Sequence, residues 1–89
     1  MAVYIIGYAL NRPGQDNPEL FEAIKSYGNW WHHLDSTWIV KTDQSAVQIR
    51  DYLRQFIDQS DELFVGKLSG HAAWTGIPEN GSNWLKNNL

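Results

Sequence analysis

The sequence predicts an α+β domain built on one antiparallel sheet. β-rich runs and helical patterns follow one another in the order β-α-β-β-α-β, and two neighbouring β-rich runs are joined only by Asp35-Ser36. So short a link suits an antiparallel hairpin, because parallel strands need a crossover of about a dozen residues or more. With 89 residues the chain is long enough for one such domain and leaves no room for a second core.

The first strand and the first helix have clear sequence signals. Residues Val3 to Tyr8 form a nearly continuous apolar run, which is typical of a central strand covered on at least one face. Turn-forming residues at positions 11–14 end this strand. Asn17 is a suitable N-cap and Pro18 a suitable first residue, so the pattern predicts a helix over 18–27 that Gly28 closes.

The middle of the chain predicts a hairpin and a second helix. The hairpin strands are Trp30–Leu34 and Thr37–Thr42, both rich in β-branched and aromatic residues. Ser45 and Gln48 have the spacing of a capping box, which opens a helix. One apolar stripe at helical spacing follows, made of Ile49, Tyr52, Leu53, Phe56 and Ile57.

The last third of the chain predicts a fourth strand and a weaker tail. Glu62 to Leu68 reads as that strand. Residues 72–77 suit a short fifth strand, 78–81 a turn, and 82–88 a helical turn or two that hold Trp84 and Leu85 inward.

This order corresponds to the split βαβ, or ferredoxin-like, arrangement, in which both helices cover one face of the sheet. We expect a ferredoxin-like domain over 1–70 and a C-terminal extension over 71–89 that packs in cis or on a dimer partner. The other sheet face then has no covering element within the chain. With Trp30, Trp31 and Trp38 on adjacent strands, we expect an exposed aromatic face, a feature of interfaces and of base-stacking platforms.

Composition excludes several classes of function. The chain has no cysteine, which excludes disulfides, thiolate metal sites and cysteine nucleophiles, and suits a cytoplasmic protein. A formal charge of −3 argues against a broad surface for polyanions. No apolar run is long enough for a membrane span, so we expect no membrane partner. P-loop, zincin and α/β-hydrolase motifs are absent.

Few residues suggest chemistry by themselves. His32 and His33 are neighbours on a predicted strand, so they point to opposite faces and cannot both bind one metal ion. One of them can act as a proton shuttle, although a lone histidine on a strand is more often a hydrogen-bonded surface residue. The scattered aspartates sit where turns and caps favour them.

Three arginines are candidate phosphate contacts. Arg12 directly follows the first strand, and a solvated loop arginine is about as good a reading as a phosphate contact. Arg50 and Arg54 form a basic ridge on the second predicted helix, which Asp51 interrupts. Most ridges of this kind are simply solvated.

The end of the first strand and the start of the third resemble the small CRISPR-associated Cas-two proteins. The resemblance rests on Tyr8-Ala9-Leu10, on Arg12, and on the stretch Ser36-Thr37-Trp38-Ile39-Val40, and it covers most of residues 1–70. The chain also looks like short bacterial proteins labelled "SinR family". The related virulence-associated protein D group are toxin ribonucleases. The resemblance implies a ferredoxin-like homodimer joined through its sheets, cytoplasmic, with a possible place in phage defence.

The resemblance also implies a metal-dependent nuclease site. This sequence departs from the family pattern at one position of that site. In the nuclease members an aspartate follows the tyrosine that ends the first strand, and the two copies hold a divalent metal across the dimer axis. Here Ala9 occupies that position, and its methyl group cannot bind Mg²⁺, which requires oxygen ligands. Ala9 is either an engineered change from aspartate, which we favour, or a natural loss in a binding protein.

Two functional hypotheses follow. The first is a homodimeric Mg²⁺-dependent endonuclease for RNA or DNA, inactive here at Ala9, with Tyr8 at the strand end, Arg12 and Ser36 positioning phosphate, and His33 as proton shuttle. The tyrosine has an alternative role in dimer packing, and the serine in closing the hairpin turn. The second is a non-catalytic dimer that binds nucleic acid, a nucleotide or a protein, with a toxin-antitoxin or phage-defence system as its expected setting.

Overall fold

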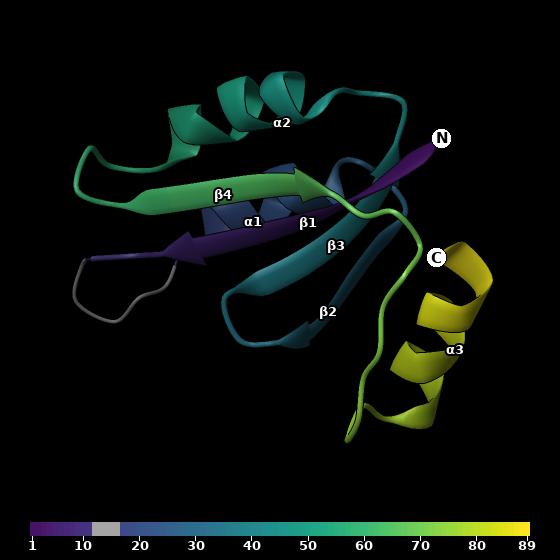
Figure 1. Cartoon of the computed structure of the whole chain (residues 1–89). Coiled ribbons are helices and arrows are strands. Elements are labelled where there is room, and N and C mark those ends of the chain that lie inside the picture. Colours follow the sequence, from purple (N-terminus) through teal and green to yellow (C-terminus); the bar gives the residue numbers. More distant parts are fainter. Residues whose placement is uncertain (12–16) are drawn as a thin grey trace.

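A computed structural model describes residues 1–11 and 17–89 and contains one four-stranded antiparallel sheet (Figure 1). The strands are β1 (Ala2–Ala9), β2 (Trp30–Leu34), β3 (Thr37–Thr42) and β4 (Glu62–Lys67), and the helices are α1 (Pro18–Lys25), α2 (Ala46–Leu53) and α3 (Glu79–Asn88). The sheet order is β2-β3-β1-β4. The α+β class and the order of the first six elements are confirmed, and a C-terminal helix is added.

Strand β1 lies in the interior of the sheet and pairs along both of its edges. It pairs with β3 from Ala2 opposite Thr42 to Gly7 opposite Thr37. It pairs with β4 from Tyr4 opposite Lys67 to Ala9 opposite Glu62, so this pairing continues further toward the C-terminal end of β1. A strand with neighbours on both sides and elements on both faces has little contact with water, which explains its nearly unbroken apolar sequence.

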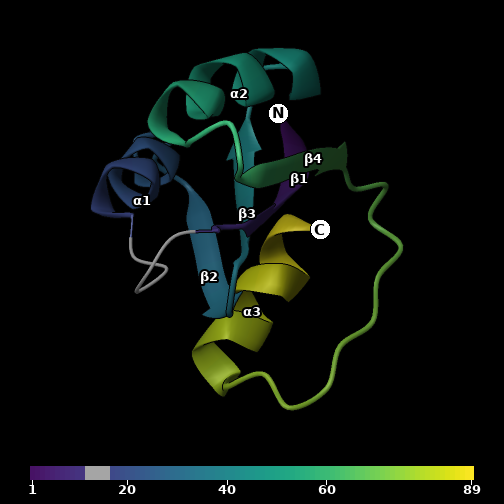
Figure 2. The ribbon, with the colours of Figure 1, turned by 90° about the vertical axis from the view of Figure 1, so that its left-hand side faces the viewer.

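Helices α1 and α2 cover one face of the sheet and form the larger core (Figure 2). Alternate residues of β1, such as Tyr4 and Ile6, point toward these helices because side chains alternate along a strand. The fully buried side chains of this core come from both layers: Ile6, Leu20, Ile24, Trp38, Val40, Ile49 and Leu53. This helix-covered face agrees with the arrangement expected from the sequence.

Helix α1 begins where the sequence indicates and ends earlier. The side-chain oxygen of Asn17 accepts a hydrogen bond from the Leu20 amide at 3.1 Å, so the predicted N-cap is confirmed. The helix ends at Lys25 rather than at residue 27. Ser26 and Tyr27 form a turn that leads into Gly28, whose φ of 90° suits glycine and breaks the helical path.

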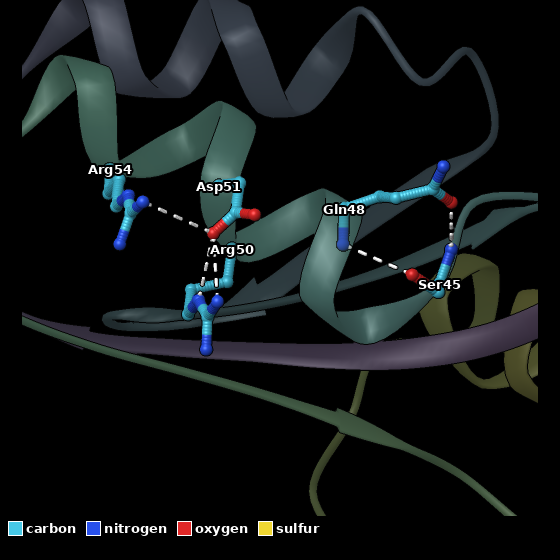
Figure 3. Close-up of polar contacts among 5 residues, drawn as sticks. All are labelled: Ser45, Gln48, Arg50, Asp51 and Arg54. Atoms are coloured by element: carbon cyan, nitrogen blue, oxygen red, sulfur yellow. Dashed lines mark hydrogen bonds and ion pairs between the residues drawn. The ribbon is translucent and has the colours of Figure 1, made fainter.

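Helix α2 has the predicted capping box and a shorter body than expected (Figure 3). The Ser45 hydroxyl accepts from the Gln48 amide at 3.1 Å, and the Gln48 side chain accepts from the Ser45 amide at 2.8 Å. After Leu53 the chain tightens into a 3-10 turn over Arg54–Phe56. Tyr52, which the sequence pattern placed in the buried stripe, is 39% exposed.

Helix α3 corrects the expectation that the second sheet face is uncovered. Leu85 packs in a second buried cluster with Val3, Trp31 and Ile39, which lie on the face opposite α1 and α2. Trp31 is only 3% exposed, and its indole nitrogen donates to the Gly81 carbonyl at 3.1 Å. The face that carries Trp31 is thus covered by the chain itself, because the tail contains a ten-residue helix where the sequence predicted a turn and only a helical turn or two.

The fifth strand predicted over 72–77 is wrong, as is the turn over 78–81. Residues 68–78 form an irregular connection that swings away from the sheet before α3 begins at Glu79 (Figure 2). Gly70 and Gly76 have φ values of 94° and 77°, which extended strands do not adopt. Gly81 lies inside α3, where the His33 ring occupies the space that a Cβ atom would need.

We predict that Leu85→Ala destabilises the protein by about 2–5 kcal/mol, since it removes most of the buried side chain by which α3 contacts the sheet. The neighbouring exposed position provides the control, Lys86→Ala, for which we expect a change below about 0.5 kcal/mol. Urea unfolding followed by tryptophan fluorescence measures both. Equal unfolding midpoints for the two variants would contradict the packing described for α3.

Candidate functional site

The end of β1 places Tyr8 against the larger core. Its phenol oxygen accepts a hydrogen bond from the indole nitrogen of Trp38 at 2.9 Å, and its ring lies 6.0 Å from that of Phe21. Burial raises the pKa of the Tyr8 phenol; the Trp38 hydrogen bond acts in the opposite direction, and the Asp35 carboxylate adds to the rise. Tyr8 is therefore protonated at neutral pH and packs, partly buried, against the core of its own chain.

Ala9 is the last residue of β1 and is exposed. It lies opposite Glu62 of β4, so their side chains share one face of the sheet. A shallow hollow of about 390 Å³ lies beside them, lined by Gly7, Tyr8, Ala9, Glu62, Leu63 and Phe64. This hollow is the nearest concave surface to the site suggested by the resemblance.

The residues around Ala9 do not form a Mg²⁺ site. Glu62 is the one carboxylate directly opposite it in the sheet. Asp61 is adjacent in sequence, but its carboxylate accepts hydrogen bonds from the Asn11 amide at 2.7 Å and the Asp58 amide at 2.9 Å, which holds the loop. Within residues 1–11 and 17–89, no three histidine, aspartate or glutamate side chains form a group that could hold a metal ion. The donor set therefore does not fit the expected cofactor.

Ser36 lies in the hairpin turn next to Tyr8. Its φ of 56° is uncommon for a residue other than glycine, and its carbonyl accepts from the Tyr8 amide at 3.1 Å. The turn thus joins β3 to the end of β1 through the main chain. Ser36 is exposed, and this geometry supports its role in closing the turn.

His33 is not brought together with Tyr8. Its ring lies against Gly81 of α3, and it is 5.2 Å from the ring of Trp31, both on the side of the sheet that α3 covers. His32 points to the other side, where its ring stacks on Trp38 at 3.8 Å. The expectation that the two histidines face opposite ways is confirmed, and a shuttle from His33 to Tyr8 has no direct path.

The arginines do not form a free basic surface in the described part of the chain. Arg50 and Arg54 both contact the carboxylate of Asp51, with nitrogen to oxygen distances of 2.9 and 3.6 Å (Figure 3). The aspartate that interrupts the ridge in the sequence thus contacts both arginines and offsets one of their two positive charges. Arg12, the third candidate, lies outside the described residues.

One row of residues across the sheet stands out, and the sequence reasoning did not identify it. Leu34, Thr37, Gly7 and Phe64 follow one another in register across β2, β3, β1 and β4. They lie on the face of α3 but beyond its buried cluster. Phe64 is 67% exposed and Leu34 49% exposed. We call these four residues the open row; its members lie far apart in the sequence, and no sequence pattern connects them.

A β-bulge gives β2 its part in the open row. Trp31 lies opposite Ile39 and Leu34 lies opposite Thr37, so three steps along β2 match two steps along β3. Such an extra residue shifts the alternation, and Leu34 consequently shares the face of Trp31. Simple alternation from Trp31 would have placed Leu34 on the other face.

No protein-family model matches the chain, and no solved structure matches it significantly. In the described ranges, no helix is both long and apolar enough to cross a membrane. The resemblance to Cas-two proteins therefore stays an expectation. The structure shows a small α+β fold with one four-stranded antiparallel sheet.

We predict that His32 makes stability depend on pH. Burial lowers its pKa below 6.5, with His33 and Lys25 acting in the same direction and Asp35 against them. The unfolded chain therefore binds this proton more readily than the folded chain. The free energy of unfolding is unaffected by this histidine above about pH 6.5, and it decreases as the pH falls from 6.5 toward the lowered pKa. Comparison of thermal unfolding between pH 7.5 and 5 for the wild type and His32→Phe measures it.

The phenylalanine keeps a ring against Trp38 and removes the titration, so we expect its stability to fall less over this pH window than that of the wild type. His71→Gln removes an exposed histidine and serves as control, with the wild-type pH dependence retained. Identical pH profiles for the wild type and His32→Phe would contradict the argument.

Proposed function

We propose that the chain, with a ferredoxin-like fold, works as a homodimer joined through the open row. The supporting observation is that this row crosses all four strands on one face and leaves two large apolar side chains, Leu34 and Phe64, in water. α3 covers only the half of this face that carries Val3, Trp31 and Ile39. An apolar stretch of sheet beside a covered half is typical of an interface.

The shape of the open row fits a second copy of the chain. The Phe64 ring leans over Gly66, where an added Cβ would lie 2.9 Å from it. Above Gly7, its neighbour on β1, no atom lies within 4 Å of where a Cβ would be. Each copy thus presents a protruding ring and an adjoining space. Under twofold symmetry each ring enters the other's space, since such an interface uses the same patch twice.

The proposed role of this dimer is binding rather than hydrolysis. Within residues 1–11 and 17–89, no three acidic or histidine side chains form a group that could hold a divalent metal, and burial raises the pKa of the Tyr8 phenol, which is protonated at neutral pH. Charge favours a protein over nucleic acid as the bound partner, because the net charge is −3 and Arg50 and Arg54 pair with Asp51. We expect this dimer to act in phage defence or in a toxin-antitoxin pair, an expectation that rests on the resemblance to the Cas-two proteins and their relatives.

We predict that Phe64→Asp converts the dimer to a monomer. The substitution replaces the protruding ring by a charge that the interface would have to bury without a partner. Sedimentation equilibrium over 1–200 μM, a range we choose to span typical dimer affinities, measures the mass. The control is Val47→Asp, which changes a residue 55% exposed on α2 and should stay dimeric. A wild type that is monomeric throughout would overturn the proposal.

A second candidate is the nuclease expected from the resemblance, and the pairing of Ala9 with Glu62 favours it. With aspartate at position 9, two carboxylates would stand opposite each other on one face, with Cβ atoms about 4.5–5.5 Å apart. Such oxygen donors suit Mg²⁺. Ser36 and Arg12 would be the phosphate contacts in that form, while the place of His33 against α3 argues against its role as shuttle.

We predict that Ala9→Asp lowers the thermal midpoint in the absence of divalent ions, because two like charges stand opposite each other, and that Mg²⁺ restores it. Ala9→Asn, of equal size without the charge, should respond to neither change. Thermal scans with and without Mg²⁺, together with cleavage assays on RNA and DNA, measure the effects. An Asp variant that shows no Mg²⁺ response and no cleavage would remove the nuclease reading.

A further inference from the structure

A second concave region lies between the sheet, α3 and the irregular connection over 68–78. It is a partly enclosed cavity of about 180 Å³. Ile5, Trp31 and Ile39 line it from the sheet, Trp74 and Ile77 from the connection, and Leu85 from α3. Leu34 and Thr37 of the open row also line it, so the cavity borders that row. It is therefore built from segments at both ends of the chain and from the middle.

The polar groups of the two tryptophans are already engaged. Trp31 donates its indole hydrogen to the Gly81 carbonyl at 3.1 Å, and Trp74 donates to the Ser82 hydroxyl at 2.9 Å. Neither donor is therefore available to a ligand, and the two indoles offer only their carbon surfaces. Among the lining side chains that the structure describes, only the Thr37 hydroxyl adds a polar atom to these indoles, and no lining side chain is charged.

The size and lining decide what such a cavity can hold. A well-held water molecule makes two to four hydrogen bonds, whereas the lining side chains offer only the Thr37 hydroxyl beyond the two engaged indoles. An apolar cavity of about 150 Å³ in another protein stays free of water and binds benzene. A cavity of about 180 Å³ therefore has room for one six-membered ring with a small substituent.

We propose that this cavity is a binding site for a small, uncharged, apolar molecule with one aromatic ring. The ligand would contact the indoles of Trp31 and Trp74 and the aliphatic side chains of Ile5 and Leu85. Charged ligands of the same size are disfavoured, because they would lose their hydration without gaining an ion pair. The site is separate from the strand-end hollow, whose lining residues it does not share.

Toluene is the probe for this site, and benzoate is its charged counterpart. We expect toluene to raise the thermal midpoint and to shift the indole N–H resonances of Trp31 and Trp74 in a two-dimensional nitrogen-proton spectrum. The resonance of Trp30, on the other side of the sheet, should move least. We expect benzoate to bind at least about tenfold more weakly. The absence of a toluene response at saturation, or equal binding of benzoate, would overturn the proposal.

Two substitutions locate the effect. Ile5→Phe fills the cavity from the sheet and should abolish the toluene shifts, whereas Val47→Phe adds the same ring on α2 and should leave them unchanged. If Ile5→Phe does not fold, the toluene titration of the wild type still tests the proposal. Phe64→Asp should bind toluene like the wild type, since Phe64 does not line this cavity. Loss of binding in that variant would place the site at a contact between copies and overturn a cavity within one chain.

Discussion

The burial of β1 on both faces is the constraint on which the rest of the structure depends. Tyr4 and Ile6 point into the core under α1 and α2, while Val3 points to the cluster under α3. A strand with so little exposed surface requires covering elements on both sides, since apolar surface left in water costs about 25 cal/mol per Å². The tail accordingly returns across the sheet, and Leu85 closes the second cluster.

The cover on the second face ends partway along β1. The register with β4 carries β1 beyond the part that α3 covers, so Gly7 and Ala9 lie on an open surface. Gly7 leaves a space there, and Phe64 beside it remains in water. The same incomplete cover thus produces both the open row, proposed as the dimer contact, and the strand-end hollow. The cavity under the 68–78 connection lies on the same face.

The residues that suggested catalysis have structural roles in the described chain. Tyr8 accepts a hydrogen bond from Trp38, Ser36 closes the hairpin at a positive φ, and His33 packs against Gly81. Each was singled out because its type or its place in a motif suits phosphate chemistry. Catalysis requires in addition that such groups meet at one point, and here His33 and Tyr8 lie on opposite faces of the sheet. Within one chain, these two residues therefore do not form a joint site.

Local sequence signals determined the strands, the hairpin and both helix starts, because caps, turns and alternation act between residues close in the chain. Asn17 and the Ser45 capping box are examples, and the opposite directions of His32 and His33 follow from the same short-range geometry. The sequence indicated only a helical turn or two over 82–88. Only the tertiary structure decided that a ten-residue helix covers the second face, with Gly81 inside it against His33. The bulge that turns Leu34 toward α3 and the register that sets Phe64 beside Gly7 arise from pairing between distant strands. The open row therefore had no counterpart in the sequence pattern, because its members become neighbours only when the sheet forms.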